Sequence, residues 1–269
     1  MNKRCYATFC GAVLVTAVPA WAGTLPLITK CPPDAVLVGQ TCVDTYEASV
    51  WQIPLANKGL INKVKKGTAK LTDLTKGGAT EISPSSSCSP SFSEDFPANG
   101  NWRSPLYAVS VPGVPPTACV TWFQAEQACR LAGKRLLTNQ EWQAAAAGTP
   151  DTSGGADNGS TDCNINSVGD AVNTGSRVNC RSSWGAFDMV GNVGEWVADW
   201  MPLSTACPGW SGRNDDLMCL AGAEATVGPG ALLRGGEFGS GTVAGVFAVS
   251  GLLPPFDGGE RFIGFRCAR

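Results

Sequence analysis

Leu-Leu-Arg-Gly-Gly-Glu-Phe at residues 232–238, Val-Ala-Gly-Val-Phe-Ala-Val at 243–249 and Phe-Ile-Gly-Phe-Arg-Cys-Ala-Arg at 262–269 close the chain. Each run is rich in apolar or β-branched residues, and clusters of Gly, Ser and Pro separate the runs. This pattern is typical of strands joined by surface loops. The segment 232–269 is therefore predicted to supply three strands.

The loops between these strands mix aromatic, aliphatic and charged side chains, which core packing does not explain. Such mixtures are typical of contact surfaces, because apolar anchors supply area and polar groups supply orientation. The alternative is a long hydrophobic loop folded back on its own domain. The candidate contact residues are Phe238, Ser240, Thr242, Ser250, Leu252, Leu253, Phe256, Asp257, Gly259, Arg261 and Phe262.

Composition indicates a globular chain with an ordinary charge balance. Its 269 residues are 43% hydrophobic and include 9 Trp, which is enough for a sizeable core. The formal net charge of -2 gives no electrostatic reason to expect binding to nucleic acid or to an anionic membrane surface.

Residues 1–22 have the pattern of a cleaved signal peptide. Lys3 and Arg4 precede an apolar run that ends in Ala20-Trp21-Ala22, a small-x-small cleavage signal. The run is shorter than the roughly 20 residues of a membrane-spanning helix, which disfavours an uncleaved anchor. We therefore expect an exported protein that is periplasmic, cell-surface or secreted and has no membrane span after cleavage.

Ten cysteines follow the signal peptide, and an even number in an exported chain favours disulfides. By their short separations, Cys31 and Cys42 are expected to join, as are Cys163 with Cys180 and Cys207 with Cys219. Ligation of zinc is the competing interpretation. The chain has no Cys-x-x-Cys pair and no histidine, so we expect no zinc.

Local signals predict an α+β, loop-rich domain. Capping-box patterns at Thr121-x-x-Gln124 and Thr138-x-x-Glu141 predict two helices, which end near Gly133 and Gly148. A hairpin is predicted around residues 39–40, and a surface insertion at about 52–116, where a lysine-rich stretch precedes a run rich in Ser and Pro.

Several motifs occur along the chain in a fixed order: Val120-Thr121-Trp122, Gly133 to Thr138, Glu141-Trp142, Phe187 to Val193 with Glu195-Trp196, Arg234-Gly235-Gly236, and Gly264 to Cys267. In this order they resemble the blocks of the formylglycine-generating enzyme (sulfatase-modifying factor) superfamily. The resemblance implies that residues 23–269 form one domain with a variant of the C-type lectin fold, in which two helices accompany short antiparallel strands. It also implies a bridge between Cys129 and Cys267, which leaves Cys88 to pair with Cys119.

Within that superfamily, Ala244-Gly245-Val246-Phe247-Ala248 most resembles the variable proteins of diversity-generating retroelements. In those proteins, adenine-directed mutagenesis rewrites the ligand-contacting positions of the final segment. The resemblance implies that residues 232–269 are a variable ligand-binding segment.

The turn after Phe187 carries several oxygen-bearing side chains, which suits a calcium ion. In the resembling family, a Gly-Asn-x-x-Glu turn holds structural calcium, so Asn192, Val193, Gly194 and Glu195 are carried over as candidate ligands. Here Gly194 stands where the family usually has Trp. The alternative is that the side chains of Asn192 and Glu195 only satisfy backbone donors.

Catalysis of the formylglycine-generating type requires a cysteine pair that holds copper. On this chain the pair would fall near Gly245 and Ser250, and neither is a thiol. The absence of histidine removes the iron ligands of a second enzymatic branch and the base of Ser-His-Asp or Cys-His sites. We therefore expect no enzyme and no copper. Acid–base chemistry by Asp257 with Glu260, and sugar binding without calcium, remain alternatives.

The sequence thus predicts an exported, non-enzymatic binding protein that displays a variable contact surface to an unknown protein or cell-surface ligand. One alternative is a formylglycine-generating-type oxidoreductase or maturation factor that lacks the usual cysteine pair. Another is an accessory subunit of a cell-surface or secretion assembly that docks through the insertion at 52–116.

Overall fold

The computed structural model describes residues 30–82, 88, 106–151, 156–166, 169–210, 212, 214–220, 222–258 and 260–269. The expected signal peptide and Gly259 lie outside the described residues. Among the described residues, no helix combines the length and the apolar character needed to span a membrane.

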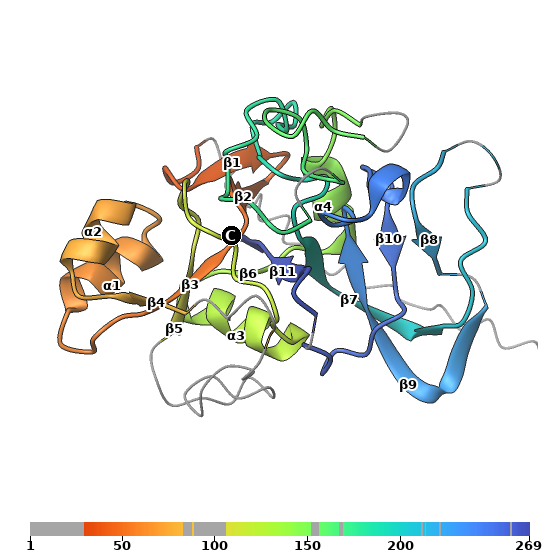
Figure 1. The fold of residues 1–269 in the computed structure, drawn as a ribbon. Helices are drawn as coiled ribbons and strands as arrows, with labels where there is room; N and C mark the ends of the chain where they lie inside the picture. Colours follow the sequence, from red (N-terminus) through yellow and green to blue (C-terminus); the bar gives the residue numbers. More distant parts are fainter. Residues whose placement is uncertain are drawn as a thin grey trace, which may run out of the picture.

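A five-stranded sheet with the order β11-β7-β9-β10-β8 organises the C-terminal half. Its centre is the long antiparallel pair of β7 (Gly194–Ser204) and β9 (Ala223–Arg234). On one side β11 (Ile263–Phe265) runs parallel to β7, and on the other β10 (Val249–Ser250) lies between β9 and β8 (Met218–Cys219) (Figure 1). The sheet therefore joins β11, near the end of the chain, to β7, which begins about 70 residues earlier.

The run at 243–249 forms less strand than predicted. It begins in the 3₁₀ turn η1 (Gly241–Val243), continues as a loop, and reaches the sheet only at β10. The loop replaces a strand because backbone bonds curl it back on itself, from Ala248 N–H to the carbonyl of Gly245 and from Gly245 N–H to the carbonyl of Gly235.

A second sheet pairs the two ends of the domain. Its order is β1-β2-β12-β6, with β1 at Ala35–Val38, β2 at Thr41–Asp44, β12 at Cys267–Ala268 and β6 at Arg135–Leu136. The predicted hairpin around residues 39–40 joins β1 to β2, and Gly39 provides the left-handed φ of +60° in its turn.

The two predicted helices are present as α3 (Trp122–Leu131) and α4 (Asn139–Ala145). Both begin with a complete capping box, because each N-cap threonine accepts from the N3 backbone while the N3 side chain accepts from the N-cap backbone. Three mostly antiparallel sheets with separate helices make the described structure an α+β fold.

The described part of the insertion at 52–116 is a packed unit, where the sequence predicted a segment lying over the surface. Helices α1 (Lys58–Lys65) and α2 (Leu71–Lys76) stand at one side of the molecule, beside the sheet β4-β3-β5 (Figure 1). That sheet consists of β4 (Thr80–Glu81), β3 (Ser49–Gln52) and β5 (Leu106–Val109). Their apolar faces build a separate hydrophobic cluster, since the lysines of this stretch alternate with buried residues. The cluster includes Trp51, Ile53, Leu60, Val64, Leu74, Tyr107 and Val109.

All ten described cysteines form disulfides, and the pairs are those expected. They are Cys31–Cys42, Cys88–Cys119, Cys129–Cys267, Cys163–Cys180 and Cys207–Cys219. The bridge between Cys129 and Cys267 spans 138 residues and joins α3 to the last strand.

Replacing Cys129 and Cys267 together by serine is expected to lower the free energy of unfolding by about 2–5 kcal/mol, because the longest covalent loop of the domain opens. Urea denaturation followed by tryptophan fluorescence measures the loss. The same double change at Cys31 and Cys42, which closes only 11 residues, is the control and should cost less. Equal losses would contradict a dependence on loop length.

Candidate functional site

Arg234, at the end of β9, anchors the loop that follows it. Its buried guanidinium donates to the carbonyls of Ala248 at 2.9 Å and Val246 at 3.0 Å, and lies 4.4 Å from the ring centre of Trp142 on α4. Burial lowers the pKa of Arg234 to about 10, so the group remains a cation at neutral pH. The loop after β9 is thereby attached to a helix of the framework.

The two glycines after Arg234 are required by close packing. Gly235 and Gly236 have φ of +89° and +76°, a region that L side chains rarely adopt. A Cβ on Gly236 would lie 2.6 Å from the Cα of Ala244, and one on Gly235 would lie 2.9 Å from the carbonyl oxygen of Met189. The turn therefore brings the following loop against the framework without room for side chains.

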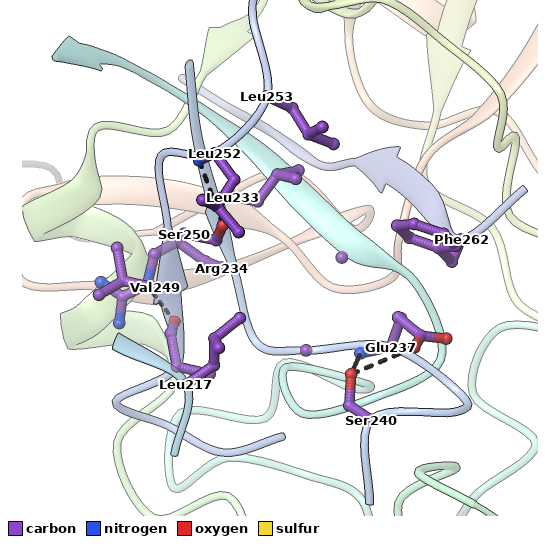
Figure 2. Close-up of a pocket in the computed structure, with 13 residues that line it drawn as sticks. Leu217, Leu233, Arg234, Glu237, Ser240, Val249, Ser250, Leu252, Leu253 and Phe262 are labelled. Atoms are coloured by element: carbon purple, nitrogen blue, oxygen red, sulfur yellow. Dashed lines mark hydrogen bonds between the residues drawn. The ribbon is translucent and has the colours of Figure 1, made fainter. Parts of the chain in front are cut away.

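A cavity of about 280 Å³ opens beside β9 and β10. Figure 2 shows leucines and Phe262 around its empty centre, with Glu237 and Ser240 hydrogen-bonded to each other at one end. The lining is mainly apolar, so the cavity suits a hydrophobic group of moderate size. The lining side chains include Leu217, Leu233, Glu237, Ser240, Val249, Ser250, Leu252, Leu253 and Phe262.

Five of the eleven predicted contact residues line this cavity, namely Ser240, Ser250, Leu252, Leu253 and Phe262. Outside the lining, the side chain of Phe256 is 69% exposed, and Arg261 is exposed as well. Thr242 and Asp257 are half-buried and do not line the cavity. The predicted set is thus brought together only in part.

Phe238 is not the solvent-facing anchor that the sequence predicted. It is buried, with 5% of its surface exposed, and its backbone N–H donates to the carbonyl of Asn192 at 3.1 Å. The guanidinium of Arg261 lies 5.1 Å from the centre of its ring and covers it. Phe238 therefore supports Arg261 from beneath, as a cation–π pair.

Sequence reasoning missed two kinds of lining residue. Leu217 comes from the strand region before β8, and only its pairing with Val249 brings it to the cavity. Glu237 follows directly after the Arg-Gly-Gly turn, and this position was the available signal. Burial raises the pKa of Glu237, while the N–H of Gly239 at 2.8 Å opposes the shift. It is the one carboxyl group in the lining.

The proposed calcium turn is occupied by protein donors. Glu195 accepts from Arg266, with Nη2 to Oε1 at 2.6 Å, and from Trp142 Nε1 at 2.7 Å. The Oδ1 of Asn192 accepts the N–H of Val172 at 2.8 Å. Both side chains are fully buried, and their oxygens already have N–H partners. The turn 192–195 therefore does not fit a calcium ion. Asn192 satisfies a backbone donor, as the alternative interpretation expected, whereas Glu195 binds side-chain donors instead.

Two further buried carboxyl groups lie near the ion pair of Arg266 and Glu195. Burial, with repulsion from Asp188 and Glu195, raises the pKa of Glu47 well above its ordinary value. Burial raises the pKa of Asp188 to about 7, although Oδ2 of Asp188 accepts the N–H of Gly175 at 2.7 Å. Arg266 therefore faces more carboxyl groups than it can neutralise, and protonation of a carboxyl relieves the excess.

Comparison with protein families identifies the domain. Residues 96–269 match the model of the sulfatase-modifying factor enzyme 1-like domain. The chain belongs to this family. Membership agrees with the C-type lectin-like α+β fold that the sequence resemblance implied, because two capped helices, paired chain ends and the bridge from α3 to β12 are all present.

Solved structures similar to this sulfatase-modifying-factor domain include the Major Tropism Determinant I1 variant, with a TM-score of 0.49 and 19% identity, and the U1 variant, with 0.45 and 21%. Each alignment covers 88% of this chain and 52% of the other, so the chain spans about half the length of those proteins. Treponema denticola variable protein 1 aligns over 58% of this chain and 71% of its own, with a TM-score of 0.37 and 20% identity. A search of curated proteins finds no match.

Two phenylalanines of the domain provide a matched stability test. Phe256→Ala should change the free energy of unfolding by no more than about 0.5 kcal/mol, because its ring is mostly in water. Phe238→Ala should cost about 3–5 kcal/mol, because it empties a buried site. Chemical denaturation measures both. A large loss from Phe256→Ala would show that its ring belongs to the core.

The pKa of Asp188 predicts a pH dependence of stability. In the unfolded chain it titrates near 3.8, so between that pH and about 7 the folded state binds a proton that the unfolded state lacks. The stability contributed by this proton is present at low pH and is lost as the pH rises to about 7. Asp188→Asn, which cannot ionise and tolerates the positive φ, should flatten the profile over this window.

Urea unfolding at a series of pH values from 4.5 to 8 tests this expectation, because the free energy of unfolding is then known as a function of pH. The control is Asp170→Asn, an exposed aspartate whose loss should leave the profile of the parent protein unchanged. Parallel profiles for Asp188→Asn and the parent protein would mean that Asp188 ionises normally in the folded state.

Proposed function

We propose that this protein is an exported, non-enzymatic binding protein, whose contact surface surrounds the cavity beside β9 and β10. The observation that carries the proposal is the cavity itself, which is mainly apolar and open, and whose lining includes the exposed Leu252. Leu252 is 39% exposed, and two further apolar side chains of the C-terminal loops, Phe256 and Phe247, are 69% and 44% exposed. Exposed apolar groups beside a preformed apolar cavity are typical of binding sites.

The chain separates framework from contact residues along one short segment. Arg234, Phe265 and Arg266 are buried and bonded or packed within the domain. Between them, Phe247, Leu252 and Phe256 lie on loops and reach solvent, whereas Leu253 and Phe262 pack partly against the core. Such an arrangement lets contact residues change while the backbone that carries them stays in place.

Recognition on this surface would combine a few apolar anchors with polar orientation. An apolar group of the ligand would enter the cavity beside Leu233, Leu253 and Phe262, while Glu237 in the lining and Arg261, next to Phe262 in the chain, offer charges. Glu237 is half-buried and bonded to Ser240, whereas the side chain of Arg261 is 47% exposed although it lies 3.9 Å from Asp170, so the arginine is the more accessible charge. Most of the affinity is expected from the anchors, as in other protein contacts.

The non-enzymatic part of the proposal is supported by the state of the cysteines. All ten described cysteines are in disulfides, so the described residues offer no thiolate pair for copper. At the positions where the family's pair would fall, Gly245 packs against the carboxylate of Asp216, and Ser250 lines the cavity. Oxygen consumption with copper and a cysteine-containing peptide would instead support the oxidoreductase alternative.

Export and a retroelement origin complete the proposal. Five disulfides are typical of an oxidising compartment, which agrees with the predicted signal peptide. The motif Ala244 to Ala248 supports a relationship with the variable proteins of diversity-generating retroelements. Its loop also ends directly at the cavity, through Ala248 and Val249.

Sequencing the gene and several kilobases on either side of it, in several isolates, tests the proposed function. We expect substitutions to gather at exposed or cavity-lining positions such as Leu252, Phe256 and Arg261, and the buried Phe238 to stay constant. A reverse transcriptase and a near-identical template repeat should lie nearby, with substitutions confined to template adenines.

The buried positions Arg234 and Gly264 are the internal control for this comparison, since both are fixed by packing. If the loops prove as constant as these two positions and no template repeat exists, the variable surface is ruled out. The cavity would then have to serve a single dedicated ligand.

A further inference from the structure

We propose that Asp151, Asp215 and Asp216 bind a divalent cation, with calcium as the preferred ion. One carboxylate oxygen from each residue lies within 4.8 Å of the others. Asp151 belongs to the loop after α4, and the other two precede β8. Oxygens on opposite sides of a calcium ion at about 2.4 Å are about 4.8 Å apart, so the spacing suits coordination of one ion.

The cluster carries negative charge that the described residues do not neutralise. No ion pair among the described residues includes any of the three aspartates. Arg234 attracts Asp216 but donates its own hydrogen bonds to Asn139, to Gln143 and to backbone carbonyls. Three carboxylates at this spacing repel one another unless a cation or protons come between them.

The burial of Asp216 is a second, independent indication. Only 2% of the residue is exposed. Its Oδ2 accepts the N–H of Phe247 at 2.6 Å, but its Oδ1 is buried and has no hydrogen-bond partner in the part of the chain that the structure describes. A buried carboxylate oxygen without a donor is costly, and a bound cation removes that cost.

The surrounding backbone is shaped to hold this carboxylate. The N–H of Asp216 donates to Asn214 Oδ1 at 2.6 Å, and the Cys207–Cys219 bridge closes the loop that carries both residues. Opposite them, Gly245 leaves the space that the carboxylate fills, since any Cβ there would collide with it. The cluster is thus positioned before an ion arrives.

The donor set decides the chemical class of the ion. All three ligands are hard carboxylate oxygens, and calcium takes six to eight oxygens with flexible geometry. Asp151 and Asp215 are exposed, so water can complete the coordination. The ion would join the loop before β8 to the loop after α4, directly behind Phe247. The site is separate from the turn at 192–195.

Burial raises the pKa of Asp216 to about 6, and repulsion from Asp151 and Asp215 adds to that shift. A proton shared between carboxyl groups is therefore the competing way to relieve the repulsion. The two alternatives can be separated at neutral pH, because a shared proton would be lost there whereas a cation would still be bound.

Terbium luminescence tests the site on the full mature chain. Terbium replaces calcium at oxygen sites, and its emission is sensitised by a nearby tryptophan. Trp210 is suitably placed, because its ring centre lies 6.0 Å from that of Phe247, whose N–H contacts Asp216. At pH 7.5 we expect saturable emission on tryptophan excitation that calcium competes away.

Two variants locate the ion. Asp151→Asn with Asp215→Asn removes both exposed carboxylates, and Asp216→Asn keeps an acceptor for Phe247 while removing the buried charge. Each should weaken terbium binding by at least about tenfold, since even outer-shell changes have effects of that size. Calcium should also raise the melting temperature of the parent protein more than that of the double variant.

Asp170→Asn, an exposed aspartate outside the cluster, is the matched control and should bind terbium like the parent protein. Absence of saturable emission, or equal affinity in the parent protein and the double variant, would overturn the proposal. The double variant decides the matter if Asp216→Asn fails to fold, because it alters only exposed side chains.

Discussion

The buried ion pair between Arg266 and Glu195 is the interaction on which the rest of the domain depends. Arg266 donates to both oxygens of Glu195, to the carbonyl of Asp44 at 3.2 Å and to that of Phe187 at 2.8 Å. One side chain thus joins the last strands to β7, to the hairpin sheet and to the loop before β7. An isolated buried guanidinium would be strongly unfavourable, so these partners must assemble together.

The same carboxylate also fixes both ends of the loops that lie between Arg234 and Arg266. Arg234 closes one end by binding Ala248 and packing on Trp142, and the indole of Trp142 in turn donates to Glu195. Arg266 closes the other end at the same carboxylate. The two arginines that bracket the loops are therefore connected through one tryptophan and one glutamate, which places both ends of the loops on a common rigid support.

Local signals in the sequence predicted the elements whose causes are local. Both helices start at capping boxes of only four residues, and the first hairpin turns at a glycine with positive φ. The disulfide pairs could also be predicted, partly from short separations and partly from the family resemblance. In each case the deciding residues are near neighbours in the chain, or belong to a motif that can be recognised directly.

The errors concern residues whose partners are distant. Glu195 has the sequence pattern of a calcium ligand, but its partner Arg266 lies 71 residues further along. Phe238 has the composition of a surface anchor, but Arg261, folding back across the loop, covers its ring. From its sequence, the insertion has the pattern of a lysine-rich surface segment. Its apolar residues pack on strands at both ends of the insertion, and 29 residues separate the end of α2 from the start of β5, so this packing is not a local signal.

The contacts that hold the 244–248 loop involve mainly its backbone, which leaves its exposed side chains free to differ. Arg234 donates to the carbonyl of Val246, Gly236 packs against Ala244, and Asp216 accepts the N–H of Phe247, so the backbone of the 244–248 loop is held at several points. None of these contacts uses the side chains of Phe247, Leu252 or Phe256, which remain exposed. Because these groups lie outside the proposed contact residues, a ligand that bound at the proposed surface would have to order little additional backbone, and a different set of exposed side chains would be carried by the same preorganised backbone.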